Sequence, residues 1–158
     1  MTNTKAAAGQ YLTFLLAEQP YGVPIGTVRE INRLSDIAAV PHAASFVAGV
    51  MNLRGKVIPV VDLRLKFGLG KAAATKESCI IVIETDHGAV GTIVDAVSGV
   101  IGLEAGQIEP PPVLGDAAQL SFLIGMGKAD DKVVVLVDAA AGLSRDHFDQ
   151  ITAADQAA

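Results

Sequence analysis

Short apolar runs alternate with polar positions along most of the chain. Between residues 10 and 137 these runs either follow a period of two or are continuously β-branched, and Gly, Asp and Pro separate them. Such runs are typical of short β-strands with tight connections, and ten of them indicate β-barrels or a sandwich rather than an α/β sheet. The expected strands are Gln10–Leu16, Gly22–Ile25, Val28–Leu34, Val47–Leu53, Lys56–Val61, Ser78–Glu84, Ala89–Val94, Ala96–Leu103, Leu120–Met126 and Val133–Val137.

Residues at the ends of these runs favour specific turns and short helices. Arg54-Gly55 joins two apolar runs, and Gly can take the positive φ that a tight hairpin needs. Asp62 precedes Leu63–Phe67 and Gly68, which predicts a helix of one or two turns with a carboxylate N-cap and a glycine stop. Asp138 predicts a similar, looser cap for a helical segment near the C-terminus.

The two halves of the chain echo each other. Phe14, Gly22 and Val28-Arg29-Glu30-Ile31 recur as Ile83, Gly88 and Val94-Asp95-Ala96-Val97. A hairpin followed by an Asp-capped helix occurs at 54–67 and again at 128–143. A true duplication would give two barrels of five strands each, packed side by side, whereas ordinary β patterning would produce the same weak matches.

Composition restricts the class of protein further. A chain of 158 residues with 51% hydrophobic and 18% charged residues is one ordered domain or two small lobes, not a disordered segment. The net charge of −5 and the 4% aromatic content argue against binding to nucleic acid or anionic lipid. The apolar runs are too short for a membrane span, and the N-terminus has no secretory pattern, so we expect a cytoplasmic protein. Its surplus apolar residues either fill the core or form a surface that another protein covers.

Groups that carry chemistry are sparse. The three His residues (His42, His87 and His147) stand far apart, so no metal site is expected. Cys79 opens an apolar strand and is read as an inert buried thiol. The glycines form no phosphate-binding motif, and no Ser lies in a nucleophile elbow. We therefore expect neither enzyme activity nor a cofactor; a small β-barrel ligand binder or enzyme would need a pocket with convergent polar groups.

An interaction surface is the remaining hypothesis. Val28, Glu30, Ile31, Val97 and Val100 lie on strands next to the expected junction between the halves, where apolar side chains would line a groove, although each residue taken alone is more typical of a core than of an interface. Arg54 is a charged residue at a hairpin tip within an apolar segment. It is either a buried ion-pair member that ties the halves together or a partner contact.

One long run identifies a family. Residues 45–64, SFVAGVMNLRGKVIPVVDLR, resemble the signature of the CheW family of chemotaxis coupling proteins. The stretches 10–14 with 21–23, 28–31, 91–100 and 125–132 agree with that family in order and spacing. The resemblance covers about residues 10–143, between a flexible N-terminus at 1–9 and a C-terminal helix with a frayed tail at 144–158.

The resemblance implies a mainly all-β fold, with two SH3-like five-stranded β-barrel subdomains packed side by side, short helices and a C-terminal helix. It also implies a cytoplasmic, non-enzymatic adaptor, recruited to membrane-associated arrays, that links the tips of methyl-accepting chemoreceptors to the regulatory domain of the histidine kinase CheA. The alternative is the same adaptor in a pilus-motility or other chemosensory-like pathway. Carried onto this chain, the receptor groove comprises Ile25, Val28, Glu30, Ile31, Ile80, Gly91, Val97 and Val100, with Arg54 supporting or contacting it, and the kinase and ring contacts are Ile37, Val57, Glu109 and Leu114.

The sequence departs from the family pattern at several positions. Pro24 stands where an acid is common, so the strand that contains it should be short or lie at an edge. Glu109 stands where a basic residue can occur, which puts an ion pair at that ring contact in question.

Overall fold

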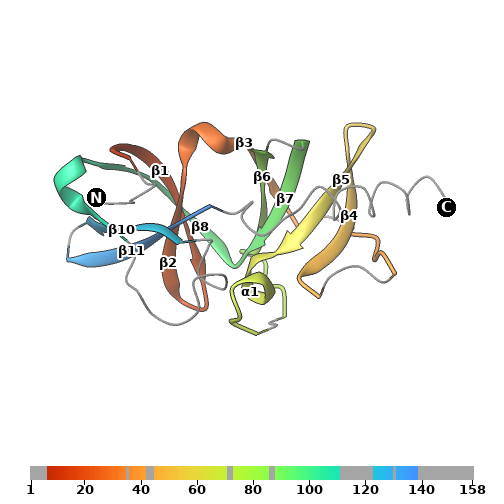
Figure 1. Ribbon diagram of the computed structural model, residues 1–158. Coiled ribbons are helices and arrows are strands. Elements are labelled where there is room, and N and C mark those ends of the chain that lie inside the picture. The colour runs from red at the N-terminus through yellow and green to blue at the C-terminus, as the bar shows by residue number, and fades with distance from the viewer. Residues whose placement is uncertain are drawn as a thin grey trace.

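The computed structural model describes residues 7–34, 36–41, 45–70, 73–85, 88–110, 123–129 and 131–138. These residues form two sheets that lie side by side, with a short helix below the second sheet (Figure 1). The elements in chain order are β1 (Gly9–Leu16), β2 (Gln19–Pro24), the 3₁₀ turn η1 (Ile25–Thr27), β3 (Val28–Arg33), β4 (Val47–Leu53), β5 (Lys56–Asp62), α1 (Leu63–Lys66), β6 (Cys79–Thr85), β7 (Gly88–Val94), β8 (Ala96–Leu103), the 3₁₀ turn η2 (Ala105–Gln107), β9 (Ile108–Glu109), β10 (Leu123–Ala129) and β11 (Lys132–Val137).

The apolar pattern locates the ten expected strands to within about three residues at each end. Pro24 is the last residue of β2, which has six residues and lies between β1 and β11 rather than at an edge of the sheet. The Asp62 carboxylate accepts from the backbone N–H groups of Arg64 and Leu65 and caps α1, which confirms the predicted N-cap. β9 was not expected because two residues are too short to produce a periodic pattern. The segment after Asp138 that we expect to be helical lies outside the described residues.

The third strand of each half leaves its own hairpin and joins the other sheet. β1 and β2 form a hairpin in the six-stranded sheet (order β8-β1-β2-β11-β10-β9), but β3 pairs with β6 of the five-stranded sheet (order β3-β6-β7-β5-β4). In return β8 leaves the β6–β7 hairpin and pairs with β1. The two barrels are therefore interleaved, and neither contains a continuous half of the chain.

The two sheets repeat the same pairings, including their irregularities. The parallel pair β5–β7 has its counterpart in β11–β2, and Gly91 of the first matches Gly22 of the second. A bulge at Arg29 in β3 matches a bulge at Ser98 in β8, and a bulge at Ala48 in β4 matches one at Ile124 in β10. This shared register supports an internal duplication.

The register corrects the alignment of the two halves expected from sequence. Phe14 is equivalent to Ile83 as expected, but Gly22 matches Gly91 rather than Gly88. Val28 likewise matches Val97 rather than Val94. The error arose because Gly88 follows a turn and therefore looked like the hairpin glycine, whereas the structurally required glycine lies three residues further along the strand.

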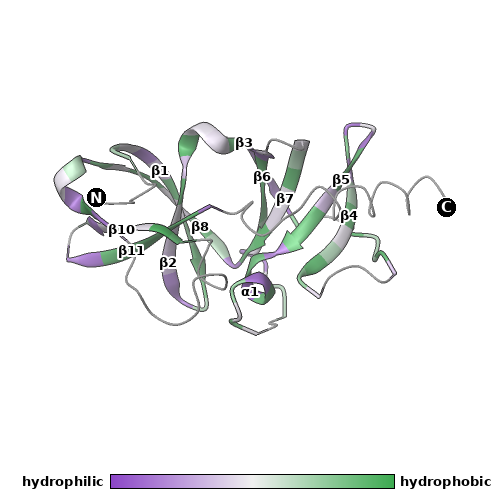
Figure 2. Cartoon of the chain, in the orientation of Figure 1, coloured by the Kyte–Doolittle hydropathy of each residue, from purple (hydrophilic) through white to green (hydrophobic). Residues whose placement is uncertain are grey.

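Three apolar clusters fill the molecule, and the strands that carry them are mostly hydrophobic (Figure 2). One lies inside each barrel. The third is shared: it combines residues of the first sheet, such as Phe14, with residues of the second, such as Ile81 and Val90, all nearly inaccessible to solvent. Because this cluster belongs to both barrels, its burial stabilises their mutual arrangement as well as each fold.

Arg64 and Asp95 add a polar tie between the barrels. Nη1 of Arg64, in α1, donates to Oδ2 of Asp95 at 2.8 Å, at the point where the chain crosses from β7 to β8. The same carboxylate oxygen accepts from the backbone N–H of Ala17, in the β1–β2 turn, at 2.9 Å. The Asp95 carboxylate, at the β7–β8 crossing, thus links α1 to the β1–β2 turn.

Gly49 allows the second barrel to close. Residue Ala38, after β3, exchanges two backbone hydrogen bonds of 2.9 Å with Val50 of β4. This bridge is the counterpart of the β9–β10 pairing in the first barrel. Gly49 has φ +148°, and a Cβ at this position would lie 2.0 Å from the carbonyl oxygen of Ala38. A side chain cannot be accommodated there unless the closing segment moves.

We expect Gly49→Ala to lower the free energy of unfolding by roughly 2–5 kcal/mol, since it adds backbone strain and a steric clash. Urea denaturation measures this effect. Gly102→Ala is the matched control, because Gly102 also lies in a strand but has open space around its Cβ position. Equal stability of the two variants would show that the Ala38–Val50 bridge does not constrain the fold.

Candidate partner-binding surface

A charged pair on the second barrel is the most ordered polar feature among the candidate residues. Arg54, at the β4–β5 tip, binds the Glu30 carboxylate of β3 with two hydrogen bonds, Nη1 to Oε2 at 2.7 Å and Nη2 to Oε1 at 2.9 Å. Asn32 Nδ2 donates to the same Oε1 at 2.9 Å. The bidentate geometry fixes both partners more firmly than a single contact would.

This arrangement favours the charged form of both groups. The hydrogen bonds from Arg54 and then from Asn32 lower the pKa of Glu30 below its usual range, although partial desolvation opposes the shift. The hydrogen bond to Glu30 correspondingly raises the pKa of Arg54. Glu30 and Arg54 are therefore both ionised at neutral pH.

The position of Arg54 excludes one of the two hypotheses for its role. Its side chain is 70% exposed, and its partner lies in the same sheet, so the interpretation as a buried tie between the halves is wrong. Sequence reasoning missed that Arg64 and Asp95 supply this tie, because only the folded chain brings α1 beside the β7–β8 crossing.

The apolar candidates divide into two groups by exposure. Ile25, Val28 and Val97 are partly buried and pack against the shared apolar cluster, at its margin. Ile31 on β3 and Val100 on β8 are 43% and 51% exposed and occupy equivalent positions of the two exchanged strands. These two side chains are available to a partner.

Ile80 and Gly91 cannot be direct contacts in this structure. Ile80 is fully buried in the apolar cluster of the second barrel, and Gly91 is buried against it. A Cβ on Gly91 would lie 3.0 Å from Cγ2 of Ile80. Both residues therefore support the sheet from inside, a distinction that a short apolar run cannot make.

The candidates for a second interface are dispersed over both barrels. Val57 is 39% exposed in β5, and Ile37 packs against the cluster of the second barrel. Glu109, in β9, forms an exposed ion pair with Lys128 Nζ at 2.5 Å, so this chain supplies its own cation there. Leu114 lies outside the described residues.

Two further residues were missed by the sequence reasoning. Asn32, which binds Glu30, has no signal in a single sequence. Val133 is 46% exposed and equivalent to Val57, since Lys56-Val57 and Lys132-Val133 begin equivalent strands. The repeated Lys-Val pair could have indicated Val133.

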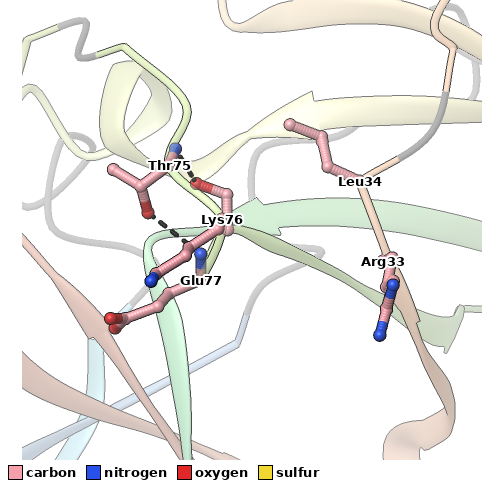
Figure 3. A pocket seen from close by; sticks show the side chains of 6 residues that line it. Arg33, Leu34, Thr75, Lys76 and Glu77 are labelled. Atoms are coloured by element: carbon pink, nitrogen blue, oxygen red, sulfur yellow. Dashed lines mark hydrogen bonds between the residues drawn. The ribbon is translucent and has the colours of Figure 1, made fainter.

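Two cavities of the described region are open to solvent. One, of about 620 Å³, is lined by Arg33, Leu34 and residues 75–78 (Figure 3). The side chains of Thr75 and Ser78 there accept from backbone N–H groups of their own turn, at 3.1 and 2.9 Å. Another, of about 330 Å³, lies between residues 7–11 and 24–26.

Other chemistry is limited in the part of the chain that the structure describes. The Cys79 thiol is partly exposed rather than buried, and its Sγ donates to the Glu77 carbonyl at 3.2 Å. His42, His87 and His147 are outside that part. Its His, Cys, Asp and Glu residues include no group of three placed to hold a metal ion. None of its helices has the length and hydropathy to cross a bilayer.

Comparison with known proteins gives one consistent family. Residues 10–147 match the CheW-like domain. The chemotaxis protein CheW of Klebsiella aerogenes is 33% identical over 129 residues, which cover 82% of this chain and 78% of that protein. Protein FrzA of Myxococcus xanthus is 32% identical over 120 residues, covering 76% and 74%. The crystal structure of the scaffolding protein TtCheW from Thermoanaerobacter tengcongensis superimposes with a TM-score of 0.76 at 40% identity, covering 83% of this chain and 89% of that one.

We expect the Glu30–Arg54 pair to make stability depend on acidic pH. Since the pKa of Glu30 is lowered by folding, its stabilising effect is present above the unfolded value near 4.5 and is lost as the pH falls through the folded value. The difference in melting temperature between the wild type and Glu30→Gln should therefore shrink on acidification below about pH 4.5. A difference that stays constant from pH 7 to pH 3 would contradict this linkage.

Proposed function

The chain belongs to the CheW family and is a chemotaxis coupling adaptor, and from this premise we propose that it joins the cytoplasmic tips of methyl-accepting chemoreceptors to the regulatory domain of the histidine kinase CheA. It does so in the cytoplasm, in membrane-associated arrays, as a scaffold without catalytic activity. The scaffold role itself accords with the likeness to TtCheW.

A single observation carries the proposal. In the described residues, the exposed large hydrophobic side chains are Ile31, Val57, Val100 and Val133. They form two equivalent sets, one on the exchanged strands β3 and β8 and one at the start of β5 and β11. A molecule that exposes the same apolar positions twice is suited to contact several partners at once.

The receptor contact is proposed on the exchanged strands. Ile31 and Val100 would pack against an amphipathic receptor helix, a common recognition mode for apolar surfaces. Ile25, Val28 and Val97 at the margin of the shared cluster would extend this surface. The Glu30–Arg54 pair, whose carboxylate lies on the other face of the edge strand β3, would set the orientation of the receptor.

The kinase and ring contacts are proposed at the hairpins of the two barrels. Val57 and Val133 supply equivalent apolar positions, one in each barrel. Ile37 and Glu109 lie in the two closing segments, next to or at the bridged positions. Contacts of this size are individually weak, so a stable array would depend on many of them acting together.

The likeness to FrzA favours a second candidate, the same kind of adaptor in another chemosensory pathway. The discriminating test adds the chain to receptor fragments and kinase of each pathway present in the source cell. Selective activation of one kinase would identify the pathway.

The test of the proposed function is co-sedimentation of the chain with a receptor signalling fragment in membranes and CheA, together with kinase activity. The expected result is a ternary complex and activation of CheA well above its rate with receptor alone. Sedimentation of neither partner with the chain would overturn the proposal.

Two matched substitutions separate the two surfaces. We expect Ile31→Asp to weaken receptor binding about tenfold or more and to leave CheA binding within twofold, because a charge cannot be desolvated against an apolar helix. Val57→Asp should have the opposite effect. Both positions are exposed, so circular dichroism should show an unchanged fold. Equal losses at both partners for either variant would refute two separate surfaces.

A further inference from the structure

Three side chains of the second barrel form a linear hydrogen-bond chain that ends at the surface. Asn32 donates to Glu30, and Glu30 accepts two hydrogen bonds from Arg54. Exposure rises from the carboxylate to the guanidinium: the Glu30 side chain is 18% exposed, whereas that of Arg54 is 70% exposed. The carboxylate therefore lies beneath, and the guanidinium is the group presented to solvent.

The geometry points to Asn32 as a positioning residue, which fixes the Glu30 carboxylate so that Arg54 can bind a carboxylate of the receptor tip. This inference rests on the proposed function and makes Glu30 the support rather than a contact, with Arg54 as the contact. It adds a residue and a partner chemistry to the receptor surface.

The alternation of β3 places Asn32 correctly for this role. Glu30 and Asn32 are two residues apart and share one face of the strand, while Ile31 lies on the opposite face. The Asn32 amide is neutral, so it can hold Oε1 without competing with Arg54 for the charge of the carboxylate. With Oε1 held from two sides, rotation of the carboxylate would break hydrogen bonds at both.

The hairpin tip places Arg54 at a cost in backbone strain. Arg54 has φ +51° and Gly55 φ +85°, which is the left-handed geometry of a tight two-residue turn. Asn or Gly would adopt the first position with less strain. Asn52 stabilises the turn, since its Oδ1 accepts from the Gly55 N–H at 2.7 Å. A residue with a long charged side chain at this strained position indicates that the side chain has a role beyond the turn itself.

The donors of Arg54 define what it can bind. A guanidinium has five N–H donors, and Glu30 takes two of them. Among the described residues, the hydrogen bonds of Arg54 go only to Glu30, which leaves the outer edge for a partner. A planar pair of donors matches a carboxylate, and Lys would not reproduce this geometry.

The first experiment is a double-mutant cycle on binding of a receptor signalling fragment, measured by titration calorimetry. We expect Asn32→Ala to weaken binding roughly threefold to tenfold, the loss of one hydrogen bond to a charged group. In the Arg54→Gln background, Asn32→Ala should have no further effect. Glu84→Gln is the matched control: it breaks the Arg29–Glu84 ion pair between β3 and β6, and binding should stay within twofold.

The second experiment identifies the partner group. Each Asp and Glu of the receptor fragment is replaced in turn by Asn or Gln. One replacement should weaken binding to the wild-type chain and have no effect on Arg54→Gln. If every replacement acts equally on both chains, Arg54 does not bind a receptor carboxylate.

The third experiment needs no partner. Carbon-detected NMR titration of the Glu30 carboxyl should show a pKa that rises in Asn32→Ala and rises further in Arg54→Gln. An unchanged Glu30 titration in Asn32→Ala, or equal losses of binding in both Arg54 backgrounds, would overturn the positioning role. If the wild-type chain does not bind the fragment, the proposed function fails, and the titration alone then decides the role of Asn32.

Discussion

The exchange of the third strand between the two hairpins is the constraint on which the rest of this structure depends. β3 continues from β2 but forms its hydrogen bonds with β6, and β8 continues from β7 but forms its hydrogen bonds with β1. Each barrel therefore needs both halves of the chain. Separation of the barrels would break two strand pairings and expose the shared apolar cluster, so we infer that the two barrels fold and unfold together.

The same exchange determines where partners can bind. β3 and β8 are the strands that leave their hairpins, and each ends a sheet. Val28 and Val97 fill the margin of the shared cluster, and Ile31 and Val100, three residues further along each strand, are exposed. This arrangement suits an adaptor, because a binding surface on strands that are packed against the core changes little in shape when a partner binds.

The duplication is not perfect, and its departures distinguish the two barrels. Glu30 on β3 is equivalent to Gly99 on β8, so the first barrel has no counterpart of the carboxylate that holds Arg54. The apolar positions therefore repeat in both barrels, whereas the charged pair occurs in only one. This difference lets a partner distinguish the two barrels, which an adaptor between two different proteins requires.

The amino-acid pattern alone determined every described strand except β9, the Asp62 cap and the family, because periodicity and a long local motif are properties of neighbouring residues. It could not determine the register of the duplication, the burial of Ile80 and Gly91, or the partner of Arg54. Each of these depends on residues far apart in the chain: Glu30 and Arg54 are 24 positions apart, and Arg64 and Asp95 are 31 apart. Only the pairing of strands that are distant in the chain brings such residues together, and a single sequence contains no signal for it.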